Sequence, residues 1–232
     1  LLLIPLVYDV MKIAHELAHG LAAKRWGAEV RDMGIVLLLL IPIPYVDTTA
    51  AWAFAEKSRR VVVGAAGILA ELVLEAIATY DFVIFESGIM KDIAYTAMLL
   101  GTVSTLLFNG NPLLRFDGYY VFADAIEIPN LSPRATRYWL YLAERYVFGL
   151  SDSNSPVAAR GERRWFLFYG AASTLYRLGI MFAIALYVAA ELPVFGFALA
   201  LSVVSKVAFP DPSVATLTKP RYVWLLPKNS MR

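Results

Sequence analysis

The sequence has no cysteine and only two histidines among its 232 residues. The lack of cysteine excludes disulfide bonds and every metal site with a thiolate ligand, and it leaves the redox compartment undetermined. Charged residues are also scarce, at 17% against about 25% in an average soluble domain. The formal net charge is +2, so the composition gives no reason to expect a nucleic-acid partner.

Apolar residues take the place of the missing charge. They make up 59% of the sequence, against about 45–50% in soluble domains, and this excess predicts an integral membrane protein. Most lysines and arginines fall on one side of the resulting topology, which the positive-inside rule identifies as the cytoplasmic side. The expected membrane segments are residues 1–23, 61–80, 93–108, 165–190 and 194–209, the last of which has Lys206 near its end.

Two stretches between these segments predict other structure. Residues 28–50 contain an apolar run that is too short to cross a bilayer and that Pro42 and Pro44 should end, so we expect a β-hairpin or a re-entrant loop. Residues 119–150 mix aromatic and charged side chains, which predicts helices at the cytoplasmic interface. The expected fold class is therefore an all-α polytopic membrane protein with one short hairpin or loop after its first helix.

A single membrane-embedded domain is expected over residues 1–232. Its core should cover about 1–128, its interfacial helices about 129–163, and about two additional membrane helices about 164–209. The sequence begins at Leu1 inside an apolar run and without a methionine, which leads us to expect a piece of a longer protein.

The strongest chemical signal is His15-Glu16-Leu17-Ala18-His19. On a helix, residues four apart lie on one face, so the two imidazoles can hold one zinc ion, and Glu16 beside them can act on a water. Asp9 and Lys12 fall on the same stripe of an otherwise apolar helix, and ionisable groups in a membrane usually face a cavity or a partner. A chance pair of helix-face histidines, or the polar seam of a transporter, are the alternatives.

A catalytic zinc needs three protein ligands, and the third must be Asp or Glu because the sequence has no further histidine or cysteine. The segment after residue 108 is the best source: Pro112 should stop the helix, and Gly110 and Gly118 should allow unusual backbone angles. Non-helical backbone at membrane depth normally lines a cavity, which would present Asp117 to the metal. The alternative for this Asp-Gly pair is an ordinary turn.

These two motifs together resemble the site-2-protease family of intramembrane zinc metallopeptidases. The family's pattern Asn-x-x-Pro-x-x-x-x-Asp-Gly is matched position by position by Asn109, Pro112, Asp117 and Gly118. The segment that contains it, Asn-Pro-Leu-Leu-Arg-Phe-Asp-Gly-Tyr-Tyr, is similar to the corresponding segment of a bacterial subgroup, the putative peptide zinc metalloproteases. Many relatives have a Gly-Pro pair in the second helix, where this sequence has Gly64-Ala-Ala-Gly67-Ile.

The resemblance implies a three-helix catalytic core in a bacterial cytoplasmic membrane, with the site towards the cytoplasm. It implies one Zn²⁺ ion held by His15, His19 and Asp117, with Glu16 as the acid–base residue and Asn109 contacting the substrate or the oxyanion. A peptide or membrane protein would be the substrate, the lipid bilayer the surroundings, and peptide-export or membrane-fusion components possible neighbours.

Three functions are compared. The leading hypothesis is a zinc-dependent intramembrane endopeptidase; the alternatives are a non-proteolytic metal-containing scaffold or subunit of a peptide export system, and a metal transporter. Residues 28–50 either offer an edge strand to the substrate or are purely structural. Glu71 and Glu75 either support the zinc site from outside or pair with Arg177.

Overall fold

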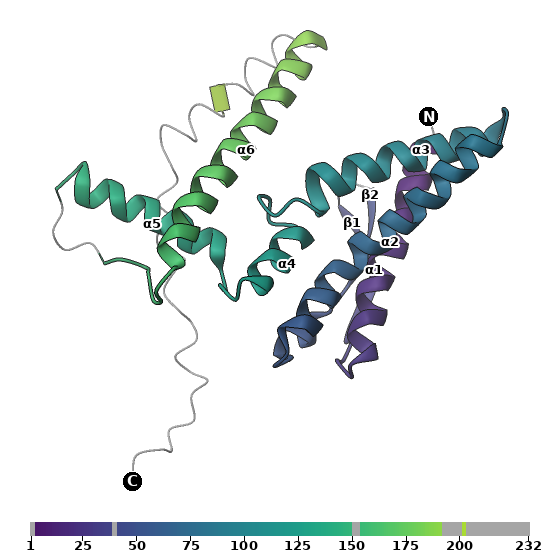
Figure 1. Ribbon diagram of the computed structural model, residues 1–232. Helices are drawn as coiled ribbons and strands as arrows, with labels where there is room; N and C mark the ends of the chain where they lie inside the picture. The colour runs from purple at the N-terminus through teal and green to yellow at the C-terminus, as the bar shows by residue number, and fades with distance from the viewer. Residues whose placement is uncertain (1–2, 39–40, 150–153, 192–200, 203–232) are drawn as a thin grey trace. The chain divides into compact units, whose positions relative to one another are not determined.

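The computed structural model describes residues 3–38, 41–149, 154–191 and 201–202 (Figure 1). It is mostly helical, with one two-stranded sheet, as the sequence predicts. Its elements are α1 (Leu3–Arg25), β1 (Met33–Leu38), β2 (Ile41–Val46), the 3₁₀ turn η1 (Thr49–Ala53), α2 (Lys57–Ile84), α3 (Ile89–Val103), the π-helical turn η2 (Ser104–Asn109), α4 (Asp117–Ala125), α5 (Leu131–Tyr146) and α6 (Glu162–Glu191).

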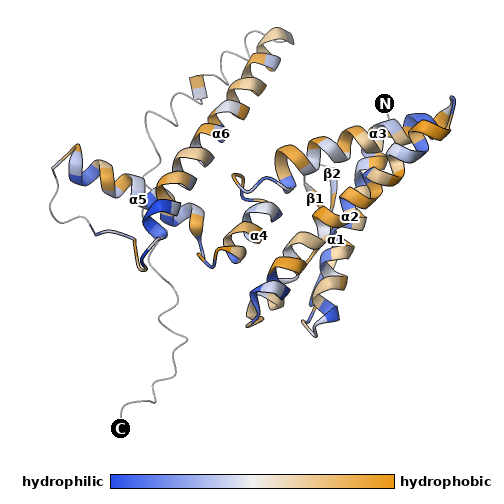
Figure 2. Ribbon diagram, in the orientation of Figure 1, coloured by the Kyte–Doolittle hydropathy of each residue, from blue (hydrophilic) through white to orange (hydrophobic). Residues whose placement is uncertain are grey.

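Helices cover the four expected membrane segments that lie within the described residues. Among these residues, α2 and α6 are long and apolar enough to cross a membrane by length and composition (Figure 2). Helix α1 has the length but is interrupted by Asp9, Lys12 and Glu16, and α3 has 15 residues before η2 continues it. The fifth expected segment, 194–209, lies outside the described residues apart from a short piece.

Helices α1, α2 and α3 pack against one another and form the core of the molecule (Figure 1). The buried residues of α1 recur every fourth position, which is the spacing of one helix face. This face includes Met11, His15 and His19, so the expected metal-binding residues point into the core instead of towards lipid. Helix α1 ends where Gly27 adopts a positive φ of 79° and its N–H bonds back to the Lys24 carbonyl.

The expected hairpin is present, with β1 and β2 antiparallel and Met33 opposite Val46. The expectation that Pro42 and Pro44 end the apolar run is wrong, because both lie inside β2. The Asp47 N–H donates to the Asp32 carbonyl, so the backbone N–H groups of odd-numbered residues in this strand point towards β1. The two prolines occupy even-numbered positions, where a backbone N–H would point away from β1. No ladder hydrogen bond is lost to either proline.

The fold separates into two compact units. The first comprises Leu1–Thr136 and Val157–Ser173, and the second Arg137–Pro156 with the remainder of the chain. Within the first unit, α4 packs on α2, and its Phe122 ring meets Trp165 of α6 at 5.6 Å between centroids. Residues 119–150, expected to be helical, contain most of α4 and all of α5.

Candidate metal centre

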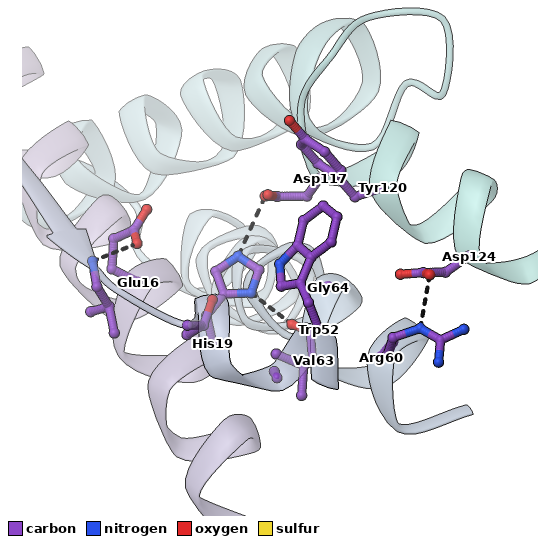
Figure 3. Close-up of a pocket in the computed structure, with 12 residues that line it drawn as sticks. Glu16, His19, Trp52, Arg60, Val63, Gly64, Asp117, Tyr120 and Asp124 are labelled. Atoms are coloured by element: carbon purple, nitrogen blue, oxygen red, sulfur yellow. Dashed lines mark hydrogen bonds and ion pairs between the residues drawn. The ribbon is translucent and has the colours of Figure 1, made fainter. Parts of the chain in front are cut away.

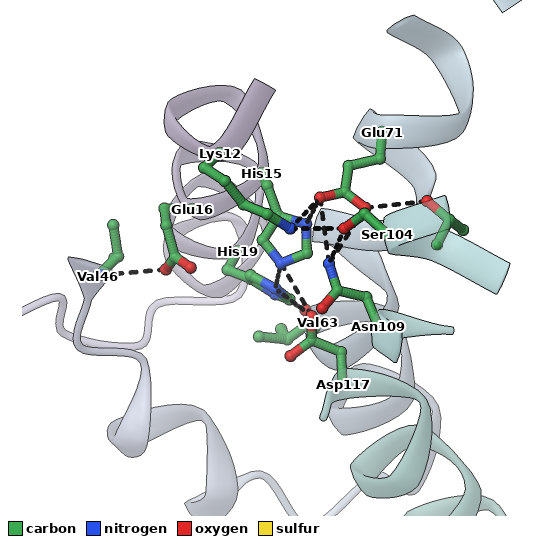
Figure 4. Close-up of polar contacts among 11 residues, drawn as sticks. Lys12, His15, Glu16, His19, Val46, Val63, Glu71, Ser104, Asn109 and Asp117 are labelled. Atoms are coloured by element: carbon green, nitrogen blue, oxygen red, sulfur yellow. Dashed lines mark hydrogen bonds and ion pairs between the residues drawn. The ribbon is translucent and has the colours of Figure 1, made fainter. Parts of the chain in front are cut away.

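Three side chains from two distant parts of the sequence converge inside the core (Figure 4). Asp117 Oδ2 lies 2.9 Å from His15 Nε2 and 3.4 Å from His19 Nε2, and the two Nε2 atoms are 3.1 Å apart. Ligands of a tetrahedral zinc at 2.0–2.1 Å are separated by about 3.3 Å. The three atoms thus already have the mutual spacing of three ligands on one metal ion.

Both imidazoles are held from behind by helix α2. His19 Nδ1 lies 2.7 Å from the Val63 carbonyl oxygen, and His15 Nδ1 lies 3.1 Å from Glu71 Oε1, although that ring N–H does not point straight at the oxygen. Acceptors at these positions favour the proton on Nδ1 and leave Nε2 as a lone pair. Two lone pairs and the Asp117 carboxylate then face one another, an arrangement that a cation stabilises.

Helix α2 approaches the histidines closely because residue 67 is a glycine. A Cβ atom built there would lie 2.5 Å from both Cε1 and Nε2 of His15, which is closer than any real contact allows. Gly67 therefore shapes the metal centre, beyond the helix packing that the Gly-x-x-Gly spacing alone suggests. Gly64, one turn earlier, has the milder constraint of Val121 at 3.1 Å.

The segment that carries Asp117 is folded back by two glycines. The Gly110 N–H closes the π-helical turn on the Thr105 carbonyl at 2.8 Å, and a Cβ at Gly118 would lie 2.6 Å from the Gly110 carbonyl oxygen. The described glycines with a positive φ are Gly27, Gly88, Gly149 and Gly161, so the unusual angles expected at positions 110 and 118 are absent. Close backbone approach is the reason for glycine at both positions.

Asp117 begins helix α4, and the neighbouring Tyr119 anchors that helix. The Tyr119 side chain is buried, and its hydroxyl oxygen accepts the Ser132 backbone N–H at 3.0 Å. Burial raises the pKa of the Tyr119 phenol, so this anchor is uncharged at neutral pH. The carboxylate of Asp117 is thereby presented from a fixed helix terminus.

Glu16 occupies the open side of the centre, where the end of β2 holds it. The Val46 backbone N–H donates to Glu16 Oε2 at 3.2 Å (Figure 4). Two cavities meet here, and Glu16 and Asp117 line both. The α2 cavity, about 300 Å³, is also lined by Trp52, Arg60, Tyr120 and Asp124 (Figure 3). The α3 cavity, about 450 Å³, is lined by Leu100, Val103, Phe108 and Phe116.

Asn109 also lines the α3 cavity, but its amide nitrogen is engaged elsewhere. It lies 3.2 Å from both carboxylate oxygens of Glu71 and 3.2 Å from Ser104 Oγ. All five residues expected at the site are thus brought to one place. The supporting polar side chains (Lys12, Glu71, Ser104 and Thr105) are not identified by the motifs, and an ionisable residue in an apolar helix is the signal that points to the first two.

Peptidase family M50, the site-2 protease family, matches residues 6–209, which is most of the chain. The chain belongs to this family. An uncharacterized protein of Methanocaldococcus jannaschii is 41% identical over 61 residues, which is 26% of this chain and 17% of that protein. The chain therefore aligns with less than a fifth of that relative's length. No solved structure matches the chain significantly.

Family M50 is a family of membrane metallopeptidases, and a membrane environment agrees with the composition of this chain and with its two apolar helices. The convergence of His15, His19 and Asp117 gives the M50 chain a set of side chains that could hold a metal. Two imidazole nitrogens and one carboxylate oxygen are the donor set of many catalytic zinc sites, which keep the fourth position open.

Proposed function

We propose that this M50 chain is a zinc-dependent intramembrane endopeptidase that hydrolyses a peptide bond in a membrane-associated peptide or protein. The observation that carries the proposal is the approach of His15, His19 and Asp117 to within 3.4 Å of one another, with Glu16 beside them at the junction of two cavities. Imidazole and carboxylate ligands in a tetrahedral set suit zinc better than the harder divalent cations.

Zinc, when bound, supplies Lewis acidity towards the scissile carbonyl and lowers the pKa of a coordinated water to about 7. The remaining chemistry belongs to the chain. Glu16 accepts a proton from the attacking water and afterwards delivers it to the leaving amine. Its carboxylate is oriented for this role by the Val46 N–H, which occupies Oε2 and leaves Oε1 for the water.

The two cavities suggest how an extended substrate passes the site. The α3 cavity has four large apolar side chains in its wall and suits the membrane-embedded part of the substrate. The α2 cavity contains Arg60 and Asp124, paired at 2.9 Å, and suits a more polar part. This end of α2 also carries Lys57 and Arg59, so the positive-inside rule directs it towards the cytoplasm of a bacterial cell.

Asn109 supports the site through the contacts of its side-chain amide. Its amide could donate to the oxyanion only by leaving Glu71 and Ser104, with which it is hydrogen-bonded. In its present contacts it holds the end of η2 against α2, and thereby supports the segment that leads to Asp117. We retain Asn109 as a site residue and assign it to the wall of the α3 cavity.

The competing hypothesis is that the protein is a metal-containing scaffold or a subunit of a peptide export system. It requires the ligands but has no use for Glu16, which lines both cavities beside them. The presence of that carboxylate, oriented by a backbone N–H, favours the enzyme over the scaffold.

The experiment compares wild-type protein, Glu16→Gln and the exposed-residue control Glu29→Gln, each reconstituted in lipid vesicles with a panel of single-helix membrane substrates. We expect Glu16→Gln to lose about 10²–10⁴-fold in cleavage rate, the usual share of acid–base catalysis, while keeping its zinc. Glu29→Gln should cleave at the wild-type rate. Equal cleavage by wild type and Glu16→Gln would exclude the proposed mechanism, and zinc binding without cleavage of any substrate would favour the scaffold.

A further inference from the structure

The least exposed charged side chain near the centre is not one of the expected ligands. Glu71 lies in the middle of the apolar helix α2, and its side chain is 1% exposed. A buried carboxylate costs several kcal/mol unless charges and hydrogen-bond donors compensate it. The contacts that the structure describes for Glu71 run to α1 and η2, the two elements on either side of the metal centre.

Lys12 supplies the compensating charge. Its Nζ lies 2.5 Å from Glu71 Oε1 and 3.0 Å from Ser104 Oγ, and its side chain is 15% exposed. Lys12 stands three residues before His15, so both side chains lie on the same helix face. The carboxylates of Glu16, Glu71 and Asp117 outnumber this one ammonium, so the site has an excess of negative charge that a cation reduces.

The same carboxylate oxygen faces the first histidine. Glu71 Oε1, which binds Lys12, is also 3.1 Å from His15 Nδ1 on the side of the ring opposite Asp117. The two histidines therefore differ: His19 has a neutral backbone carbonyl behind it, whereas His15 has a charged carboxylate. The His15 N–H is not aligned with Glu71 for a hydrogen bond, but the negative charge 3.1 Å away favours the proton on Nδ1 and leaves Nε2 for a metal. Carboxylates behind ligating imidazoles commonly have this role.

The other oxygen of Glu71 reaches the segment that leads to Asp117. Oε2 accepts the Thr105 hydroxyl at 2.9 Å, and both oxygens lie 3.2 Å from the Asn109 amide nitrogen. The π-helical turn makes these contacts possible, because its larger number of residues per turn brings Ser104 and Asn109, five residues apart, to the same side. One carboxylate thus joins the helix of the two histidines to the segment of the third ligand (Figure 4).

We propose that Glu71 and Lys12 are a positioning pair for the metal: Glu71 sets the tautomer and orientation of His15 and ties η2 to α1, and Lys12 balances its charge. The inference rests on the proposed function, because it assumes that His15 binds a metal. A purely structural ion pair between helices would contribute to folding but would leave the metal's coordination unchanged once the protein is folded.

The test measures zinc affinity by competition with a chromophoric chelator, together with the visible absorption spectrum of the Co²⁺-substituted protein in detergent. The variants are Glu71→Gln, the charge-neutral double variant Lys12→Met/Glu71→Gln, and Thr105→Val as the matched control. Thr105→Val removes one hydrogen bond between Glu71 and η2 but leaves the Asn109 contact that joins the same two elements, and it keeps the contacts of Glu71 with Lys12 and His15. The double variant avoids a buried unpaired ammonium and keeps the test valid if the single variant fails to fold.

We expect zinc affinity to fall about 10–100-fold in the folded double variant, as is usual on loss of a contact behind a ligating histidine, with a changed Co²⁺ spectrum. Thr105→Val should keep both the affinity and the spectrum. A folded double variant with wild-type affinity and spectrum would overturn the inference and leave the proposed function intact. Wild-type protein that binds neither metal would instead overturn the proposed function, and this inference with it.

Discussion

Asp117 Oδ2 lies 2.9 Å from His15 Nε2, so the first residue of α4 meets the middle of α1 at one point. If a metal joins them, the third ligand cannot be removed without losing the metal. We expect about one zinc per wild-type chain by elemental analysis, and its near-complete loss in Asp117→Ala. The fall in zinc affinity should be larger than the fall of about 10–100-fold that follows the loss of a residue that contacts a ligand but not the metal.

The matched control for this substitution is Asp124→Asn. Asp124 lines the same α2 cavity on the same helix, but it pairs with Arg60 at 2.9 Å and does not belong to the group of potential ligands. It should retain the full zinc content. Equal zinc in Asp117→Ala and in wild type would mean that the two histidines find their third ligand elsewhere.

Removal of the metal should destabilise the protein by an amount that grows with the logarithm of the ratio of metal concentration to Kd. A ligand present at about 100 times its Kd stabilises the folded state by about 2.7 kcal/mol, which for a chain of this size corresponds to roughly 5–10 °C in Tm. We therefore expect a strong chelator to lower the Tm of the wild-type protein by this amount. Asp117→Ala should begin at the lower Tm and show no further decrease, and a chelator effect of equal size on both proteins would indicate that it acts away from this site.

Sequence alone predicts which side chains lie together in those parts of the candidate site that depend on local periodicity. His15 and His19 share a helix face because they are four residues apart, and their place in an apolar helix directs them inwards. Asp117 follows from the lack of any other histidine or cysteine and from the motif around it. The helices follow from apolar runs, although α3 begins earlier than expected and ends in a π-helical turn.

The rest depends on which helices face one another, and hydropathy does not determine that. Glu71 could have supported the zinc site or paired with Arg177, and the structure places it against Lys12 and His15. The role of Gly67 likewise cannot be predicted from the sequence, because a side chain is excluded there by the close approach of α2 to the two imidazoles. The effect of the two prolines of β2 also cannot be predicted from hydropathy, because it depends on whether the backbone nitrogen of each points towards β1 or away from it.

Gly67→Ala should damage the metal centre with one methyl group. The added Cβ would lie 2.5 Å from His15 Nε2, so either the imidazole or helix α2 must move. Displacement of a packed side chain costs about 1–3 kcal/mol, which corresponds to roughly a 10–100-fold loss in zinc affinity. The measurement is the same chelator competition, with far-ultraviolet circular dichroism to check that the helices are kept.

Gly64→Ala is the control, because its Cβ would meet the Val121 methyl group at 3.1 Å and no imidazole. A shift of a few tenths of an ångström by Val121 should accommodate it, with zinc affinity close to that of wild type. Similar losses in both variants would show that α2 tolerates no side chain along this whole face, and that Gly67 has no special relation to the histidines.

Val46→Pro tests whether β2 orients Glu16. The Val46 N–H donates to Glu16 Oε2, and position 46 has the same orientation in the strand as Pro42 and Pro44, so a proline here removes no ladder hydrogen bond. A hydrogen bond to a charged group is worth about 1.5–3 kcal/mol, so we expect cleavage to slow roughly 10–100-fold at unchanged zinc content. Val46→Ala keeps the N–H and removes the same side-chain contact with α1, so it should cleave near the wild-type rate. If both variants slow equally, the packing of β2 on α1 matters and the backbone donor does not, and the acid–base role of Glu16 would then need another source of orientation.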